Sequence, residues 1–159
     1  MGILNEDMKR LVDEQKLGFV ATVGADGTPN LSPKGTMVVL DDEHIAFGEI
    51  RSPNTVENLR HNPVLEINFV DPFARKGYRF KGRADFLERG SDAFNASFAP
   101  FAQWGDLANT INGIVRVRVE RALPITSPAY DMGASEADLR AQWTDTFERI
   151  QPGGRFAGR

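Results

Sequence analysis

Cysteine is absent from the 159 residues of this chain, which excludes disulfides, thiolate catalysis, cysteine-ligated zinc and iron–sulfur clusters. Only two histidines occur, His44 and His61, and neither has a carboxylate or a second histidine at metal-ligand spacing. No apolar run approaches the roughly 20 residues of a membrane-spanning helix. Residues 1–16 lack the apolar core of a signal peptide. We therefore expect a cytoplasmic protein without a membrane partner.

Length and composition are those of one ordinary domain. Hydrophobic residues make up 41% and charged residues 26% of the chain, which is too apolar for a disordered protein. We expect a single domain over residues 1–150 and a flexible tail over residues 151–159. The formal net charge of −3 argues against nucleic acid as a partner. Residues 51–89 nevertheless hold eight basic and five acidic groups, which favours a small anionic ligand.

Hydrophobic periodicity predicts a mostly β protein of the α+β class. Apolar residues recur at helical spacing from Leu4 to Val12, with a suitable N-cap at Asn5. Further helices are predicted over residues 53–61 and 136–150, the latter begun by the capping-box pair Ser135 and Asp138, and residues 91–101 are predicted as a helix or helical loop. The six predicted strands span residues 17–23, 29–40, 44–49, 64–70, 78–86 and 114–120. Short strands separated by turn signals and brief helices are typical of a small, mostly antiparallel barrel.

The first candidate for chemistry is the segment Ser32-Pro33-Lys34-Gly35. On an extended chain the side chains of Ser32 and Lys34 point to the same face, where both can donate to one phosphate. Gly35 lets a ligand approach the backbone closely. The alternative is an exposed strand interrupted by a proline. Because Ser-x-Lys is a common pattern, that alternative is favoured when the segment is taken alone.

The second candidate is the start of the helix predicted at residues 53–61, where the sequence reads Arg51-Ser52-Pro53-Asn54-Thr55. A helix N-terminus leaves backbone N–H groups unpaired and carries a partial charge of roughly +0.5, so it attracts phosphate. Ser52 suits the N-cap and Pro53 the first helical position. An ordinary capped helix explains both residues equally well but does not explain Arg51, so the two interpretations are even.

The third candidate is a run of cations on the strand predicted at residues 78–86. Arg79, Lys81 and Arg83 share one face and repel one another unless water or an anion offsets their charge. A solvated outer face is the alternative, and it is favoured more for Arg83 than for the other two. Trp104 is a separate case, because it lies in a polar loop. For this aromatic a dimer interface and ring stacking both remain open.

These segments occur in one order with characteristic spacing. The landmarks are Phe19–Val23, Asp26–Gly35, Ile45–Phe47, Arg51–Thr55, Asn62-Pro63, Ile67–Phe69 and Tyr78–Gly82. In combination they resemble the small FMN-binding split-barrel proteins related to pyridoxamine 5′-phosphate oxidase. The resemblance runs from about Leu17 to Gly82, and the segment Ser127–Asp131 is similar to one branch of small single-domain members.

The resemblance implies a six-stranded antiparallel Greek-key split barrel with short flanking helices and a C-terminal helix. It also implies a homodimer with FMN at the subunit interface and a small-molecule redox substrate. The helix start at Ser52, Asn54 and Thr55 corresponds to the phosphate site. The full set of cofactor-binding candidates is Ser32, Pro33, Lys34, Gly35, Phe47, Gly48, Glu49, Arg51, Ser52, Asn54, Thr55, Arg79, Lys81 and Trp104. No residue stands out as a proton donor.

Departures from the oxidase itself bear on the reaction. The oxidase has an arginine at the position of Ser32, a basic pair at Pro53-Asn54 and a glutamine at Gly77. It also has a C-terminal substrate segment of arginine and histidine, where this chain has a helix and a glycine-rich tail. We therefore expect an FMN-dependent oxidoreductase that accepts electrons from a nicotinamide donor and does not turn over pyridoxamine 5′-phosphate. Two other interpretations stay open: an FMN-binding or storage module without turnover, and a split barrel that binds a deazaflavin or haem.

Overall fold

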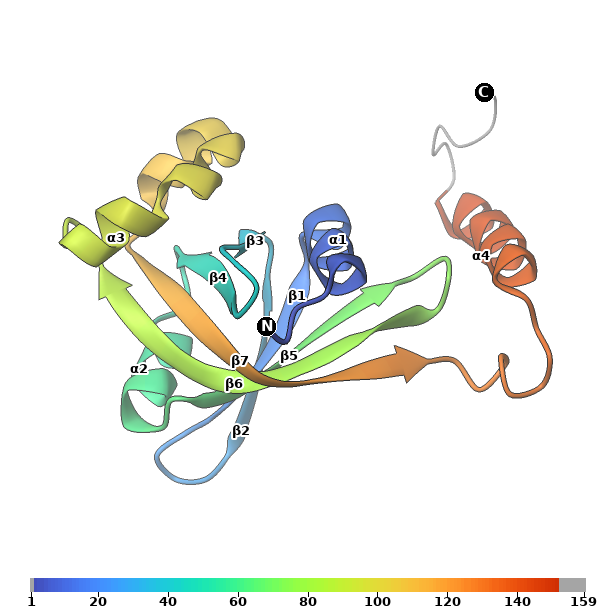
Figure 1. Ribbon diagram of the computed structural model, residues 1–159, viewed down its shortest axis with the longest axis horizontal. Helices are drawn as coiled ribbons and strands as arrows, with labels where there is room; N and C mark the ends of the chain where they lie inside the picture. The colour runs from blue at the N-terminus through green and yellow to red at the C-terminus, as the bar shows by residue number, and fades with distance from the viewer. Residues whose placement is uncertain (1, 152–159) are drawn as a thin grey trace.

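The computed structural model describes residues 2–151, in which seven antiparallel strands form one sheet in the order β2-β1-β5-β6-β7-β4-β3. The strands are β1 (Gly18–Val23), β2 (Pro29–Lys34), β3 (Met37–Val39), β4 (His44–Glu49), β5 (Val64–Asp71), β6 (Lys76–Glu88) and β7 (Gly113–Thr126). The helices are α1 (Glu6–Gln15), α2 (Pro53–His61), α3 (Asp92–Ser97), the 3₁₀ helix η1 (Ala99–Thr110) and α4 (Glu136–Ile150). In Figure 1, β6 and β7 run across the whole molecule, with α3 near one end and α4 beyond the other.

The sheet curls on itself because its two edge strands are consecutive in the chain. β2 and β3 lie at opposite edges of the sheet, yet only Gly35 and Thr36 separate them. Three steps along an extended chain span at most about 11 Å, so the two edges must approach each other here. The predicted antiparallel split barrel of the α+β class is therefore confirmed. Its strand count is seven rather than six, because the strand predicted at residues 29–40 divides at this connection.

The barrel interior is filled by inward-facing residues of the strands. Phe47, Phe69 and Phe80 are fully buried there, and the rings of Phe69 and Phe80 meet edge to face with centroids 6.2 Å apart. Helix α1 packs against β3 and β5 and adds Leu11 and Val12 to the same core. This core fixes which side of each strand faces inward, and therefore which residues of β2 and β4 can face a ligand.

Helices α3 and η1 cover the outer face of one half of the sheet only. Val38, Ala46 and Ile114 of β3, β4 and β7 form a second buried cluster with Phe94 and Phe101 of these two helices. On the other half of the sheet, large hydrophobic side chains of β1, β2 and β5 stay exposed in this chain. The two halves of the outer surface therefore differ in character.

Several predicted elements are present with changed bounds. The strands predicted at 78–86 and 114–120 extend to Lys76–Glu88 and Gly113–Thr126, with a register shift that leaves Glu120 unpaired. The helix or helical loop predicted at 91–101 is the pair α3 and η1. The predicted tail, residues 151–159, lies outside the described residues except for Gln151. None of the helices between residues 2 and 151 has the length and hydrophobicity that a membrane crossing requires.

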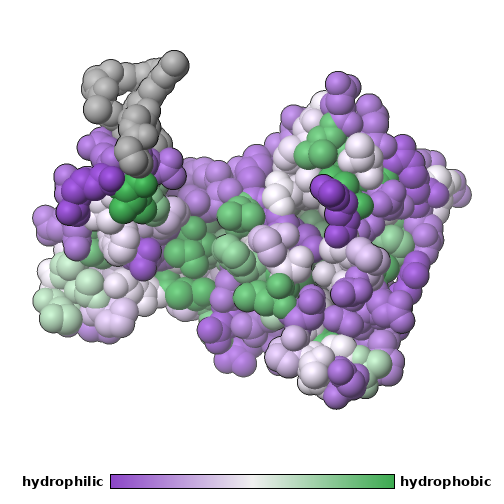
Figure 2. Space-filling model, turned by 180° about the vertical axis from the view of Figure 1, so that it is seen from behind, coloured by the Kyte–Doolittle hydropathy of each residue, from purple (hydrophilic) through white to green (hydrophobic). Residues whose placement is uncertain are grey.

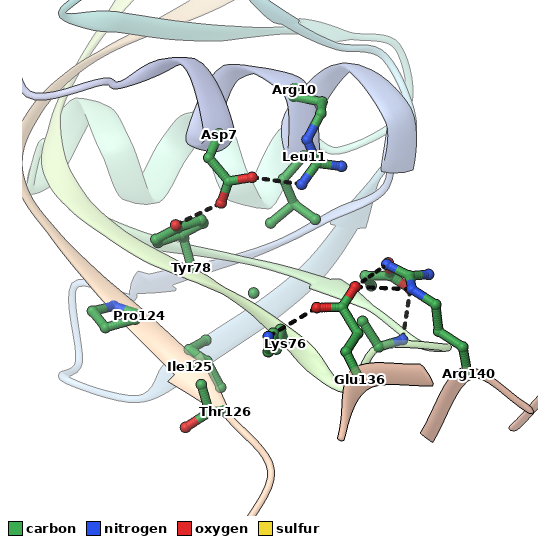
Figure 3. Close-up of a pocket in the computed structure, with 13 residues that line it drawn as sticks. Asp7, Arg10, Leu11, Lys76, Tyr78, Pro124, Ile125, Thr126, Glu136 and Arg140 are labelled. Atoms are coloured by element: carbon green, nitrogen blue, oxygen red, sulfur yellow. Dashed lines mark hydrogen bonds and ion pairs between the residues drawn. The ribbon is translucent and has the colours of Figure 1, made fainter. Parts of the chain in front are cut away.

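Helix α4 begins with the predicted capping box, and a network of charged groups attaches it to the rest of the chain (Figure 3). The Arg140 guanidinium contacts the carboxylates of Asp71 and Glu136, each at 2.8 Å, and Lys76 reaches Glu136 at 2.9 Å. Leu139 is buried and the Phe147 ring lies 5.1 Å from that of Phe73, but Ile150 is 63% exposed. Charged and apolar contacts therefore both hold α4.

The pKa values in this network set its response to acid. Hydrogen bonds from Lys76 and Arg140 hold the pKa of Glu136 below its ordinary value. Burial opposes ionisation of Asp71, but the backbone N–H groups of Ala74 and Phe73 and the Arg140 guanidinium together keep its pKa low as well. A carboxylate with a lowered pKa contributes stability above its unfolded-state pKa and loses it as the pH falls through the lowered value.

We expect Arg140→Gln to loosen α4 at neutral pH by about 0.5–1 kcal/mol, a small value because the Arg140 side chain is 43% exposed and solvent screens its charge. Amide hydrogen exchange of α4 measures this directly. In the unaltered protein the same loosening should appear only below about pH 4. Arg149→Gln, which removes contacts within α4 alone, is the control. Equal exchange rates in the two variants would contradict the role given to Arg140.

Candidate functional site

Two hollows adjoin each other where the edges of the sheet meet. The larger, of about 370 Å³, is lined by β2, the end of β4 and η1, and the smaller, of about 220 Å³, lies between β2 and the start of α2. Ser32, Arg51 and Ser52 line both, so we treat them as one site and name it the seam cleft. The other lining residues are Asn30, Leu31, Pro33, Lys34, Gly35, Thr36, Gly48, Ile50, Pro53, Asn54, Thr55, Trp104 and Leu107.

The seam cleft brings together ten of the fourteen predicted cofactor-binding residues. Those that line it are Ser32, Pro33, Lys34, Gly35, Gly48, Arg51, Ser52, Asn54, Thr55 and Trp104. Phe47 and Glu49 are buried behind its wall, and Arg79 and Lys81 lie on the outer face of the sheet. Two separate sequence candidates, the Ser32–Gly35 segment and the start of α2, thus form one site.

Six of the lining residues are outside the predicted set. They are Asn30, Leu31, Thr36, Ile50, Pro53 and Leu107. Ile50 and Thr36 directly follow predicted site residues, so their position in the chain was a usable signal. Leu107 had none, because its place in the wall depends on how η1 folds back over the end of β4.

Lys34 is the most unusual group in the site. It is only 7% exposed, and its ammonium donates to the Ser32 hydroxyl at 2.7 Å and lies 5.8 Å from the centre of the Phe47 ring. Among residues 2–151 the Ser32 hydroxyl is its one hydrogen-bond partner, although an ammonium has three donors. Burial lowers the pKa of Lys34, and the negative charge of Glu49 partly offsets this. A buried ammonium with spare donors is well placed to bind an anion or a carbonyl oxygen.

The start of α2 differs from the sequence prediction in one respect. Ser52 occupies the predicted N-cap position, but its side chain does not cap the helix. Its backbone N–H instead donates to Oε1 of Glu49 at 2.6 Å, and its hydroxyl lies 3.4 Å from the same oxygen. The expectation that Ser52 caps α2 with its side chain is therefore wrong. The buried Glu49 carboxylate binds Ser52 instead, and the spacing of residues in the sequence does not reveal this contact.

The η1 wall of the cleft is held in place by close packing. Trp104 is half-buried, with its ring 5.9 Å from that of Phe101 and the Lys16 ammonium 5.5 Å from its centre. Gly48 is needed at the opposite wall, because a Cβ there would come within 2.6 Å of the Ile111 side chain. The cleft thus combines a tryptophan and apolar side chains on one side with cationic and hydroxyl groups on the other.

The predicted cations of β6 lie apart from the seam cleft in this chain. Arg79 pairs with Glu66 at 3.0 Å. On the outer face, the cross-strand neighbours that lead from Arg79 toward the edge of the sheet are Asn68 of β5, Phe19 of β1 and Pro33 of β2. Lys81 lies one row further along the same face and is exposed. The role of Arg79 and Lys81 in cofactor binding stays a prediction. It requires that the cleft of a second chain lie against this outer face.

A third hollow, of about 320 Å³, lies between α1, the β6–β7 ladder and α4 (Figure 3). Its charged groups are already paired with one another, as Asp7 is with Arg10 and Tyr78, and Glu136 with Lys76. It holds none of the predicted residues and no buried group with spare donors like Lys34. The seam cleft is therefore the better candidate for a ligand site.

Comparison with known proteins gives a consistent result. The family model described as pyridoxamine 5′-phosphate oxidase matches residues 4–125, well beyond the segment that the landmarks cover. No curated protein sequence matches the chain. HupZ from Group A Streptococcus is 33% identical, with a TM-score of 0.69, and the match covers 79% of this chain and 96% of that one.

Two more distant structures share the fold. HutZ of Vibrio cholerae, described as a heme storage protein, is 24% identical with a TM-score of 0.63, and the match covers 77% of this chain and 94% of that one. An FMN-binding protein from Syntrophomonas wolfei is 12% identical with a TM-score of 0.65, covering 77% of this chain and 86% of that one. The same barrel is thus described with different ligands in different proteins.

We expect Lys34→Met to raise the free energy of unfolding at pH 7 by about 1 kcal/mol, because a buried charge with one partner is replaced by an apolar chain of similar length. A lysine whose pKa is lowered by folding destabilises the native state while it is charged. The advantage of the variant should therefore shrink as the pH rises toward 10.5, the ordinary lysine value. Urea denaturation at several pH values measures it. A variant less stable than the parent would contradict this account of Lys34.

Proposed function

The chain belongs to the pyridoxamine 5′-phosphate oxidase family, and we propose that it binds FMN in the seam cleft and acts as an FMN-dependent oxidoreductase. The observation that supports this most directly is the buried Lys34 ammonium, with one hydrogen-bond partner, in a cleft that also includes a helix start. Such a group is costly to bury unless a ligand completes its hydrogen bonds.

The residues of the cleft suit the two chemically different parts of FMN. Arg51, Asn54 and the hydroxyl of Thr55 surround the start of α2, where the Asn54 N–H and the helix dipole favour a phosphate. Trp104 and Leu107 offer apolar surface in the larger hollow, which suits a flat ring. Lys34 and Ser32 lie between them, so both can donate to the ligand.

The chemistry of the site would come from the cofactor, since FMN supplies hydride transfer at its ring when bound. The residues of this chain bind it, orient it and exclude water. The half-buried Trp104 and Ile50 line the larger hollow and would cover part of a bound ring. The Lys34 ammonium contributes positive charge and hydrogen-bond donors in a desolvated place, where such interactions are stronger than in water.

Haem is the alternative that the likeness to HutZ raises, and the histidines argue against it. His44 hydrogen-bonds to Asp41 at the start of β4, and His61 is exposed at the end of α2. Neither lines the seam cleft, and no methionine or tyrosine does so between residues 2 and 151. Flavin therefore fits the lining better than haem. A deazaflavin presents a similar ring, and the absorption spectrum distinguishes it.

We also propose a homodimer that forms through the uncovered half of the sheet. Phe19 is 44% and Leu31 66% exposed there, on the same outer face as Val70 and Leu123. Figure 2 shows hydrophobic surface gathered on the side seen from behind, between the lobe that carries α4 and the rest of the molecule. Monomeric proteins seldom leave contiguous apolar patches of this kind in water. A second copy packed here would also bring Arg79 and Lys81 to the interface.

The proposed function is tested by FMN titration of the purified protein, followed by fluorescence. We expect saturable binding and flavin absorption bands, and Lys34→Gln should weaken binding about 10- to 100-fold, the scale of a charge-assisted hydrogen bond. Anaerobic addition of a nicotinamide donor should bleach the flavin band, and pyridoxamine 5′-phosphate should not. Lys9→Gln, which removes a surface lysine that pairs with Asp42 and does not line the seam cleft, is the control.

The outcomes are clear-cut. Absorption typical of haem, or no saturable flavin binding, would overturn the FMN proposal. FMN binding without reduction by any donor would leave a binding module and overturn the enzymatic part. Turnover of pyridoxamine 5′-phosphate would refute the expectation drawn from the departures at Ser32, Pro53-Asn54 and Gly77.

The dimer is tested by sedimentation at micromolar concentration. Phe19→Glu places a charge in the middle of the uncovered face, so we expect it to shift the protein from dimer to monomer by at least tenfold in dissociation constant. Met132→Glu changes another exposed hydrophobic side chain, away from this face, and should leave the dimer intact. A parent protein that sediments as a monomer and keeps its FMN would disprove the interface.

A further inference from the structure

We propose that Glu49 limits the affinity of the seam cleft for doubly charged phosphate and thereby sets how strongly the site prefers FMN over the same flavin without phosphate. The inference rests on the proposed function, because FMN is the ligand that it concerns. It adds a selectivity role to a residue that neither hollow exposes directly.

The Glu49 carboxylate is fixed from both sides at the end of β4. It is 6% exposed, and its Oε1 accepts the N–H of Ser52 at 2.6 Å. The side-chain amide of Asn112 lies 3.3 Å from Oε2, and the Asn112 backbone N–H donates to the Glu49 carbonyl at 2.8 Å. The protein therefore places its own anion on one of the first N–H groups at the start of α2.

This position matters because Ser52 lines both hollows. A phosphate at the start of α2 would lie on the open side of Ser52 while the Glu49 carboxylate lies on the buried side. The fixed positive charges of the cleft are Lys34 and Arg51, together with the partial charge of the helix start. Glu49 cancels one of them, which leaves less positive charge than a phosphate monoester of charge near −2 requires.

A purely structural role for Glu49 makes a different prediction. If the side chain only supplied acceptors, Glu49→Gln would keep the hydrogen bond from the Ser52 N–H, turn its amide donor toward the Asn112 amide, and leave FMN affinity unchanged or weaker. If the negative charge itself opposes phosphate, the same substitution removes the repulsion and tightens FMN binding. The charge and the hydrogen bond can thus be separated by one conservative substitution.

The experiment compares FMN and riboflavin binding to the unaltered protein, Glu49→Gln and Glu57→Gln. Riboflavin is the same flavin without the phosphate, so it reports the contacts of the ring and ribityl chain alone. We expect Glu49→Gln to bind FMN about tenfold more tightly, with riboflavin changed by less than about twofold. Glu57 is exposed on α2, so its variant controls for overall net charge and should match the parent.

The possible results distinguish the role of Glu49 from FMN binding itself. Equal FMN affinity in the parent and Glu49→Gln, or weaker FMN binding in the variant, overturns the role of Glu49 and leaves FMN binding intact. Failure of all three proteins to bind FMN overturns the proposed function and this inference together. Should Glu49→Gln fold poorly in a melting experiment, Glu49→Ala tests the same point. It also removes the charge and frees the Ser52 N–H, so it must tighten FMN binding too.

Discussion

The two-residue connection between β2 and β3 is the constraint on which the rest of the structure depends. Because Gly35 and Thr36 join strands at opposite edges of the sheet, the sheet must curl and its edges must meet. The end of β2 then lies beside the end of β4, from which the chain enters α2. A hydroxyl and an ammonium on one strand are thereby placed next to a helix start on another, and the seam becomes a cleft.

The same constraint explains the unusual electrostatics of the site. The inward-facing side of β2 is part of the barrel, so Lys34 is desolvated against Phe47 rather than extended into water. The end of β4 is equally buried, so Glu49 is removed from solvent and finds its partners in Ser52 and Asn112. One positive and one negative group are thus fixed close to the start of α2, and their balance determines how much negative charge a ligand can bring.

Much of this arrangement could be predicted from the sequence, because it depends on local patterns. Alternating hydrophobicity located the strands, and the Ser52-Pro53 pair located the start of α2. Family resemblance joined the Ser32–Gly35 segment to that helix start. The rest depends on long-range packing. No local signal divided the strand at Gly35, placed Leu107 in the wall through η1, or assigned the Ser52 N–H to Glu49 instead of leaving the serine to cap its own helix.

A crystal structure of the protein with FMN tests the central claim most directly, because it locates the phosphate. The account predicts the phosphate at the start of α2, within hydrogen-bond distance of the Lys34 ammonium or the Arg51 guanidinium, and the ring beside Trp104. A phosphate bound instead on the outer face beside Arg79 and Lys81, with the seam cleft free of ligand, would contradict it.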